Sequence, residues 1–303
     1  MKTRLNSPVL IPPLLARLPP LSFDSPHGPL NMSCTTHTIT LDPSKYDQEQ
    51  INLMEERLIL LDNDDRAIGE GSKKDCASLA ILVCSVQSAD HKRSVGHLIP
   101  PAGSAETRSP LHRAFSVFLF HPQTGKLLLQ RRADEKITFP KMWTNTCCSH
   151  PLTSFGEMDE EGQIGVRRAA ARKLTHELGI PHTYPLDDFA YLTRIHYYAP
   201  SDEIWAEHEI DYIFFLTLDP KTDINPNEVS DVKWVSKADL EDFFKDPSST
   251  FTPWFRLIAE SFLYKWWDAL LASRKDESQP LDAKALIAEV EKEKATMGSI
   301  IRM

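Results

Sequence analysis

The sequence predicts an α+β fold, in which helices pack against the faces of a mixed β-sheet and further helices follow at the C-terminal end. Segments rich in aliphatic and aromatic residues, bounded by turn residues, come both before and after one strongly helical segment at 165–178. Helical composition returns from residue 237 onward. This order of strands, helix, strands and helices is expected when helices cover a sheet.

The predicted elements can be placed by residue range. Strands are expected at 56–62, in a hairpin at 113–132, and at 189–199, 207–219 and 231–236. Helices are expected at 165–178, at 237–245, from about 254 to 273, and at 282–295, where a charged helix should be loosely attached. Gly179 should end the first helix, because glycine readily adopts the left-handed conformation of a helix C-terminus.

Three regions are expected along the chain. Residues 1–49 form a disordered or leader-like N-terminal region, residues 50–275 form the folded domain, and residues 276–303 form a helical tail. The first 23 residues carry three basic residues and no acid. Their prolines would interrupt an amphipathic helix, so a disordered tail is favoured over an organelle-targeting leader.

Composition and charge exclude several classes of protein. The 303 residues are 41% hydrophobic and 25% charged, an ordinary globular mixture, and the longest apolar run, at 79–86, is less than half of the roughly 20 residues that a membrane span needs. The net charge is −9, so nucleic acid and anionic membranes are poor partners, and an anionic substrate would need locally placed Lys and Arg. Five cysteines, an odd number, point to a reducing compartment rather than a disulfide framework.

The stretch TNTCCSHPL at 144–152 concentrates reactive side chains. A redox pair, a metal site and an acid/base site are all open interpretations. Cys147 and Cys148 lack the two-residue spacer of a thioredoxin-type motif, so the redox interpretation is weak. Buried structural thiols remain an alternative.

Two pairs of residues in this chain are spaced to share one face of an extended strand. Residues i and i+2 point the same way, so Cys148 would face with His150, and Glu207 with Glu209. Together with His112 they would suit Mn²⁺, Zn²⁺ or Mg²⁺. The alternatives are a solvated strand face for the two glutamates and a surface or capping position for His112.

The helix end RKLTHELGI at 172–180 resembles the core of the Nudix signature, whose carboxylates bind Mg²⁺ for diphosphate hydrolysis. The matching positions are Arg172, Leu174, Glu177, Gly179 and Ile180. Lys173 and His176 replace two acidic positions, so the resemblance implies a retained scaffold without hydrolysis, in which Glu177 could still bind one Mg²⁺. An ordinary helix with a glycine cap is the alternative.

Longer motifs resemble the type I isopentenyl-diphosphate isomerases of the eukaryotic, fungal kind. They are LHRAFSVFLF, KITFPKMWTNTCCSHPL, GVRRAAARKLTHELGI, LTRIHYYAPSD, EHEIDYI and TPWF, in this order, and the match covers about residues 50–270. The resemblance implies a Nudix-like domain that interconverts isopentenyl and dimethylallyl diphosphate, in isoprenoid and sterol biosynthesis, by adding one proton and removing another. Such a reaction moves no hydride, so no flavin or nicotinamide is needed.

The same resemblance assigns roles to individual residues. Cys148 transfers one proton, Glu209 with Tyr197 transfers the other, and the Trp254 ring faces the carbocation. The expected metal ligands are His112, His150, Glu207 and Glu209 for one divalent ion (Mg²⁺, Mn²⁺ or Zn²⁺) and Glu177 for a second, substrate-linked Mg²⁺. The expected substrate contacts are Lys73, Arg132, Lys136 and Ser149. We expect a monomer with a small prenyl diphosphate as its partner, in the cytoplasm or, alternatively, in peroxisomes or mitochondria.

One departure from the family pattern affects the metal site. The family places a metal-binding histidine four residues after the lysine matched by Lys73, but this position is Ala77. An atypical insertion at 77–110 then replaces a much shorter link. Either His97 is the displaced ligand or the site is one ligand short; a translated intron is the explanation we favour. A Nudix-type diphosphohydrolase and a non-catalytic descendant are therefore the alternative functions.

Overall fold

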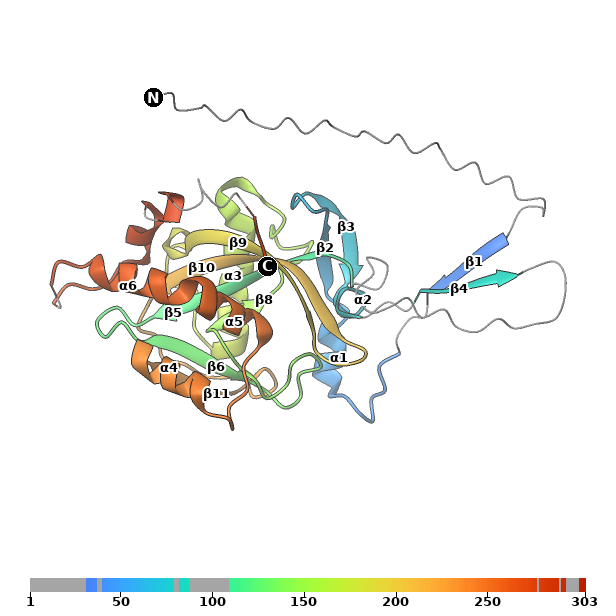
Figure 1. Ribbon diagram of the computed structural model, residues 1–303, viewed down its shortest axis with the longest axis horizontal. Coiled ribbons are helices and arrows are strands. Elements are labelled where there is room, and N and C mark those ends of the chain that lie inside the picture. Colours follow the sequence, from blue (N-terminus) through green and yellow to red (C-terminus); the bar gives the residue numbers. More distant parts are fainter. Residues whose placement is uncertain are drawn as a thin grey trace, which may run out of the picture.

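A computed structural model describes the chain in seven segments: 31–36, 40–78, 82–87, 109–276, 278–288, 290–292 and 300–303. They form one large sheet flanked by helices and a separate antiparallel pair of strands, β1 (Asn31–Thr36) and β4 (Leu82–Gln87) (Figure 1). Residues 1–30 and His97 lie outside the described segments. Among the described helices, none is long and apolar enough to cross a membrane.

The large sheet is mixed, as predicted. Its ten strands in the described segments are β2 (Arg57–Leu61), β3 (Ala67–Ser72), β5 (His112–Phe120), β6 (Leu127–Arg132), β7 (Trp143–Thr144), β8 (Cys147–Ser149), β9 (Ala190–Pro200), β10 (Ala206–Thr217), β11 (Val229–Val235) and β12 (Ile301–Arg302). The central order is β11-β6-β5-β10-β9-β12. Strand β10 runs parallel to β5 and antiparallel to β9. The predicted hairpin and the three strands predicted after residue 188 are confirmed.

The sheet is the middle layer of the fold, and β5 shows why. All nine of its residues are buried, because alternate side chains enter two different cores. Phe115 and Val117 pack in one cluster with the apolar side of α3 (Ile164–Leu178). Phe118 and Phe120 pack in the other cluster, with the C-terminal helices.

Helix α3 ends where the sequence predicted. Gly179 has φ +64, and a Cβ at this position would lie 2.4 Å from the carbonyl oxygen of Asp223. Any other residue would therefore meet both an unfavourable backbone conformation and a clash. Glu177, two residues before this cap, is buried.

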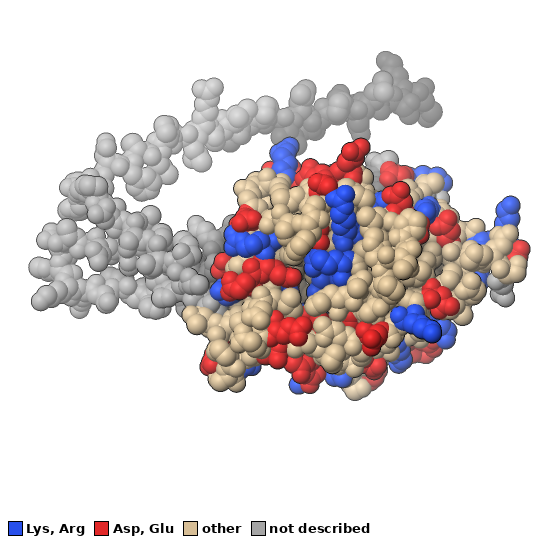
Figure 2. Space-filling view, turned by 180° about the vertical axis from the view of Figure 1, so that it is seen from behind, with Lys and Arg blue, Asp and Glu red and all other residues tan. Residues whose placement is uncertain are grey.

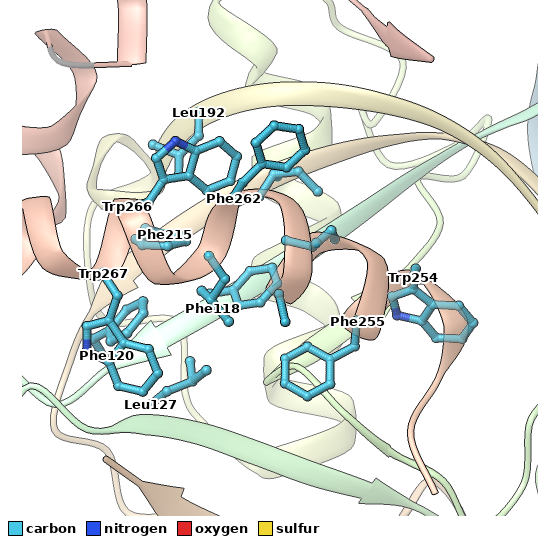
Figure 3. Packing of buried hydrophobic residues seen from close by; sticks show 14 of the residues in the cluster. Phe118, Phe120, Leu127, Leu192, Phe215, Trp254, Phe255, Phe262, Trp266 and Trp267 are labelled. Atoms are coloured by element: carbon cyan, nitrogen blue, oxygen red, sulfur yellow. The ribbon is translucent and has the colours of Figure 1, made fainter. Parts of the chain in front are cut away.

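The second face of the sheet is covered by aromatic-rich helices. These are α5 (Pro253–Ile258), a π-helical turn (Ala259–Leu263) and α6 (Tyr264–Ala272), preceded by α4 (Lys237–Lys245). Figure 3 shows Trp266 and Trp267 beside the phenylalanines of β5 and β10, with Trp254 apart at the beginning of α5. The predicted helices are confirmed, and their packing places Trp254 at the edge of the core.

The C-terminal segment 276–303 is helical at 283–288 and 290–292, as expected, but it is not loosely attached. It contains a 3-10 turn at Ala283–Leu286 and ends in β12, which pairs in parallel with β9. Apolar side chains spaced along it are buried in the larger core: Leu281, Ala283, Leu286 and Val290. The expectation of loose attachment was wrong because the many charges of the segment concealed this apolar side.

Candidate active site

Three neighbouring strands bring side chains of the candidate site to one level of the sheet. Glu209 on β10 is directly opposite His112 on β5 and directly opposite Tyr197 on β9. Glu207 precedes Glu209 by two residues and therefore points to the same face. His150 follows β8, a short strand that pairs with β5.

The two histidines and two glutamates form a compact group of potential metal ligands. One ligand atom from each of His112, His150, Glu207 and Glu209 lies within 4.8 Å of the others. His150 Nε2 is 2.9 Å from Glu209 Oε1, and His112 Nε2 is 3.4 Å from Glu207 Oε2. All four residues are buried, which excludes the solvated strand face as an interpretation of the glutamates.

The hydrogen bonds of this group fit a divalent cation. The His112 Nδ1 atom is 2.9 Å from the Pro110 carbonyl oxygen, so Nδ1 carries the proton and the lone pair of Nε2 faces the glutamates. His112 Nε2 and Glu207 Oε2 are buried without a hydrogen-bond partner, which is costly unless an ion occupies the space between them. Imidazole and carboxylate together suit Mg²⁺, Mn²⁺ or Zn²⁺.

Glu209 also contacts Tyr197, whose hydroxyl donates a hydrogen bond to Glu209 Oε2. Burial alone would raise the pKa of Glu209, but the neighbouring His112 and His150 together outweigh burial and lower it. Burial, reinforced by the Glu209 charge, raises the pKa of Tyr197 well above its usual value. Tyr197 therefore keeps its proton and can share it with the carboxylate.

The adjacent cysteines face opposite sides of the sheet. Cys147 is fully buried in the cluster beneath α3, whereas Cys148 packs against the other core and lines a cavity. Desolvation raises the pKa of the Cys148 thiol to about 12, although the Arg132 charge opposes this. Both thiols are free, and their opposite orientation gives them different surroundings despite their adjacency.

The cavity has a volume of about 30 Å³ and is bordered by most of the predicted site residues. Its lining comprises Lys73, Phe115, Ser116, Arg132, Lys136, Thr138, Cys148, Ser149, His150, Glu177, Tyr197, Glu207, Glu209 and Trp254. His112 belongs to the ligand group without lining the cavity. His97 lies outside the described residues. Ala77, at the end of α2 (Lys73–Ala77), packs against apolar residues that include Trp205.

Known proteins share both the domain and most of the sequence. Residues 110–255 match the NUDIX domain family. An isopentenyl-diphosphate delta-isomerase of Phaffia rhodozyma is 56% identical over 247 residues, 81% of this chain and 89% of the relative. Isomerases of the same name from Gibberella zeae (51%, covering 75% and 81%) and Schizosaccharomyces pombe (49%, covering 73% and 88%) are also similar. The chain belongs to the isopentenyl-diphosphate delta-isomerase family. The resemblance seen in the sequence is thereby confirmed, and so is the Nudix fold.

In this isomerase family member, basic side chains from three elements border the cavity. Lys73 begins α2, Arg132 ends β6, and Lys136 follows in the next loop. Arg132 is fixed by donating to the carbonyl oxygens of Phe139 (3.0 Å) and Thr138 (2.9 Å). On the face drawn in Figure 2, basic side chains gather in a band beside acidic ones, so positive charge is concentrated locally in a protein of net charge −9.

Trp254 lies between the basic side of the cavity and the Tyr197–Glu209 pair. The Arg132 guanidinium is 5.8 Å from the centre of the Trp254 ring, and the Tyr197 ring centre is 6.3 Å away. The indole Nε1 donates to Asn145 Oδ1 at 3.2 Å, which fixes the ring orientation. The tryptophan therefore offers an aromatic surface to the cavity.

Glu177 borders the cavity apart from the His/Glu group. Its carboxylate is 3.2 Å from Lys173 Nζ and accepts hydrogen bonds from Gln130 (3.0 Å) and Cys147 (3.5 Å). Lys173 thus places an ammonium where the Nudix signature has an acid. This charge replacement supports the expected loss of hydrolysis.

Two buried carboxylates that contact residues of the cavity wall were missed in the sequence. Asp211 continues the alternation of Glu207 and Glu209 and accepts a hydrogen bond from Ser116 at 2.8 Å; burial and then the Glu209 charge raise its pKa well above the usual value. The i, i+2 pattern could have revealed Asp211. The other carboxylate, Glu228, contacts Lys136 through an ion pair that no local pattern indicates.

Proposed function

We propose that this protein interconverts isopentenyl diphosphate and dimethylallyl diphosphate, with Cys148 and the Tyr197–Glu209 pair as its two proton-transfer groups. The observation that carries this proposal is that a thiol from β8 and a tyrosine–carboxylate pair from β9 and β10 border one small cavity next to basic side chains. Isomerisation requires one group that adds a proton and another that removes one.

The proposed reaction begins with protonation of the terminal alkene carbon, which places a positive charge on the neighbouring tertiary carbon. Loss of a proton from the carbon on the other side forms the new double bond. One of the two groups, the Cys148 thiol or the Tyr197–Glu209 pair, gives the first proton, and the other accepts the second. In the reverse reaction the groups exchange these tasks.

The carbocation needs stabilisation beyond proton transfer, because alkene protonation is strongly unfavourable. The Trp254 ring is held by Asn145 at the cavity edge, and an aromatic face attracts a cation by about 0.5–2 kcal/mol.

The diphosphate would be bound by Lys73, Arg132, Lys136 and the hydroxyl of Ser149. We assign His112, His150, Glu207 and Glu209, with His97 as a fifth candidate, to one divalent cation, and Glu177 to a substrate-linked Mg²⁺. When bound, these ions would fix the carboxylates and neutralise diphosphate charge.

We also propose a monomeric enzyme of isoprenoid and sterol biosynthesis in the cytoplasm, with peroxisomes or mitochondria as the alternative.

The test is incubation of the purified protein with isopentenyl diphosphate and Mg²⁺. Formation of dimethylallyl diphosphate without release of phosphate supports the proposal. Release of phosphate or pyrophosphate would indicate a diphosphohydrolase instead. A protein that contains stoichiometric metal yet forms neither product would be a non-catalytic family member. Ala77, which replaces the family's metal-binding histidine, would then be the candidate cause.

A further inference from the structure

Behind the Lys136 ammonium lies a carboxylate that is not part of the cavity wall. Glu228 precedes β11 directly and is 3% exposed. Its Oε2 atom is 2.7 Å from Lys136 Nζ. The carboxylate therefore contacts Lys136 without occupying the space available to a ligand.

Two other elements hold the Glu228 carboxylate in place. Gln50, in α1 (Gln48–Leu53), donates from Nε2 to Glu228 Oε1 at 3.0 Å. Lys173, in α3, places its Nζ 3.8 Å from Glu228 Oε2. The same Gln50 amide donates to the Asn227 side chain at 2.6 Å. Glu228 is consequently fixed from both sides before any substrate binds.

The surroundings of Lys136 make a counter-ion necessary. The charged or titratable groups that face it are Glu228, Lys73, Arg132, Lys173 and His176. Burial lowers the pKa of Lys136 to about 8, Glu228 opposes this effect, and the other cations add to it. Without the carboxylate, the ammonium would lose its proton more readily still.

We propose that Glu228 is a positioning residue that holds Lys136 as a cation, aimed at the cavity, so that it can bind the diphosphate group of the substrate. This inference rests on the proposed function. Glu228 itself touches no reacting atom: it acts through Lys136. Gln50 extends the same arrangement, because α1 then supports the diphosphate site through one hydrogen bond to Glu228.

The first test is Glu228→Gln, which keeps the shape of the side chain and removes its charge. The pH dependence of kcat/KM reports ionisations of the free enzyme. Wild-type kcat/KM should fall as pH rises through about 8, where Lys136 loses its charge. In the variant this fall should begin at least about one pH unit lower, because a neighbouring opposite charge typically shifts a pKa by about 1–3 units. KM should rise at least about fivefold at pH 8 with kcat little changed.

Two comparison variants separate this role from a general charge effect. Glu70→Gln removes one charge from a half-exposed ion pair with Arg57 on the surface and should leave the profile unchanged. Adding Lys136→Arg to Glu228→Gln should restore KM at high pH, because a guanidinium stays protonated without a counter-ion. A wild-type profile in Glu228→Gln, or no recovery in the double variant, would overturn the proposal.

A comparison within a Lys136→Met background covers the case in which Glu228→Gln alone does not fold. In a Lys136→Met background, adding Glu228→Gln should change pyrophosphate affinity less than about twofold, because Glu228 has lost the group through which it acts. A tenfold further loss would refute the proposal. These affinities are measured by calorimetry with inorganic pyrophosphate, which requires no turnover. An inactive wild-type protein would refute the proposed function. The pyrophosphate affinities of the variants would still decide the role of Glu228.

Discussion

The two adjacent cysteines allow a sharply controlled test, because the same substitution is made one residue apart. Cys148→Ala removes the thiol that borders the cavity, whereas Cys147→Ala removes one buried beneath α3. A positioned acid or base contributes about 10²–10⁴ in rate, which corresponds to about 3–5 kcal/mol of activation free energy. Cys148→Ala should therefore lower kcat at least about 10²-fold and leave the melting temperature nearly unchanged.

Cys147→Ala should show the reverse pattern. Removing a fully buried sulfur should cost about 1–2 kcal/mol of unfolding free energy. Glu177 loses a weak donor at 3.5 Å but keeps Gln130 and Lys173, so kcat should fall less than about tenfold. Steady-state kinetics and thermal unfolding of both variants provide the measurement. Equal losses of kcat would refute the assignment of Cys148.

Other substitutions test the remaining parts of the site. Glu209→Gln should reduce kcat about 10³-fold and lower the metal content, because it removes a base and a ligand together; near-normal turnover would exclude Glu209 from proton transfer. Trp254→Leu should reduce kcat about 30-fold while Trp254→Phe retains more, since a desolvated cation–π contact contributes about 2 kcal/mol; equal rates in the two variants would argue against a cation at this ring. If 77–110 is foreign, a short linker that restores a histidine four residues after Lys73 should raise metal content and turnover together, and a shortened protein that gains neither rules this out. If His97 already binds metal, His97→Ala should lower both, and unchanged values would exclude it.

Sequence periodicity was sufficient for the elements that carry a long local pattern. The hairpin around 113–132 and the helix at 165–178 were predicted because alternation, composition and the Gly179 cap agree. Strands β7 and β8 have only two and three residues, too few to show alternation. Of the two, β8 matters more for the site: because it pairs with β5, Cys147 and Cys148 point to opposite faces of the sheet.

The candidate site was predicted unevenly, for a physical reason. Spacing placed Glu207 with Glu209, and family resemblance supplied His112, Tyr197 and Trp254, all of which the fold brings together. The contacts that hold Lys136 in place, through Glu228 and Gln50, could not be predicted. Its ion pair with Glu228 joins residues 92 positions apart, and the Gln50 hydrogen bond spans 178. Such contacts depend on the folded sheet, and no local pattern records them.

The most direct test of proton addition and removal is turnover in D₂O. Isopentenyl diphosphate is incubated with the Mg²⁺-loaded full-length protein, and NMR follows deuterium in the product and phosphorus in the reaction mixture. We predict dimethylallyl diphosphate that carries deuterium in a methyl group, with the diphosphate intact, and Cys148→Ala should abolish both the product and the label. Release of phosphate, or isomerisation that persists undiminished in Cys148→Ala, would contradict this account.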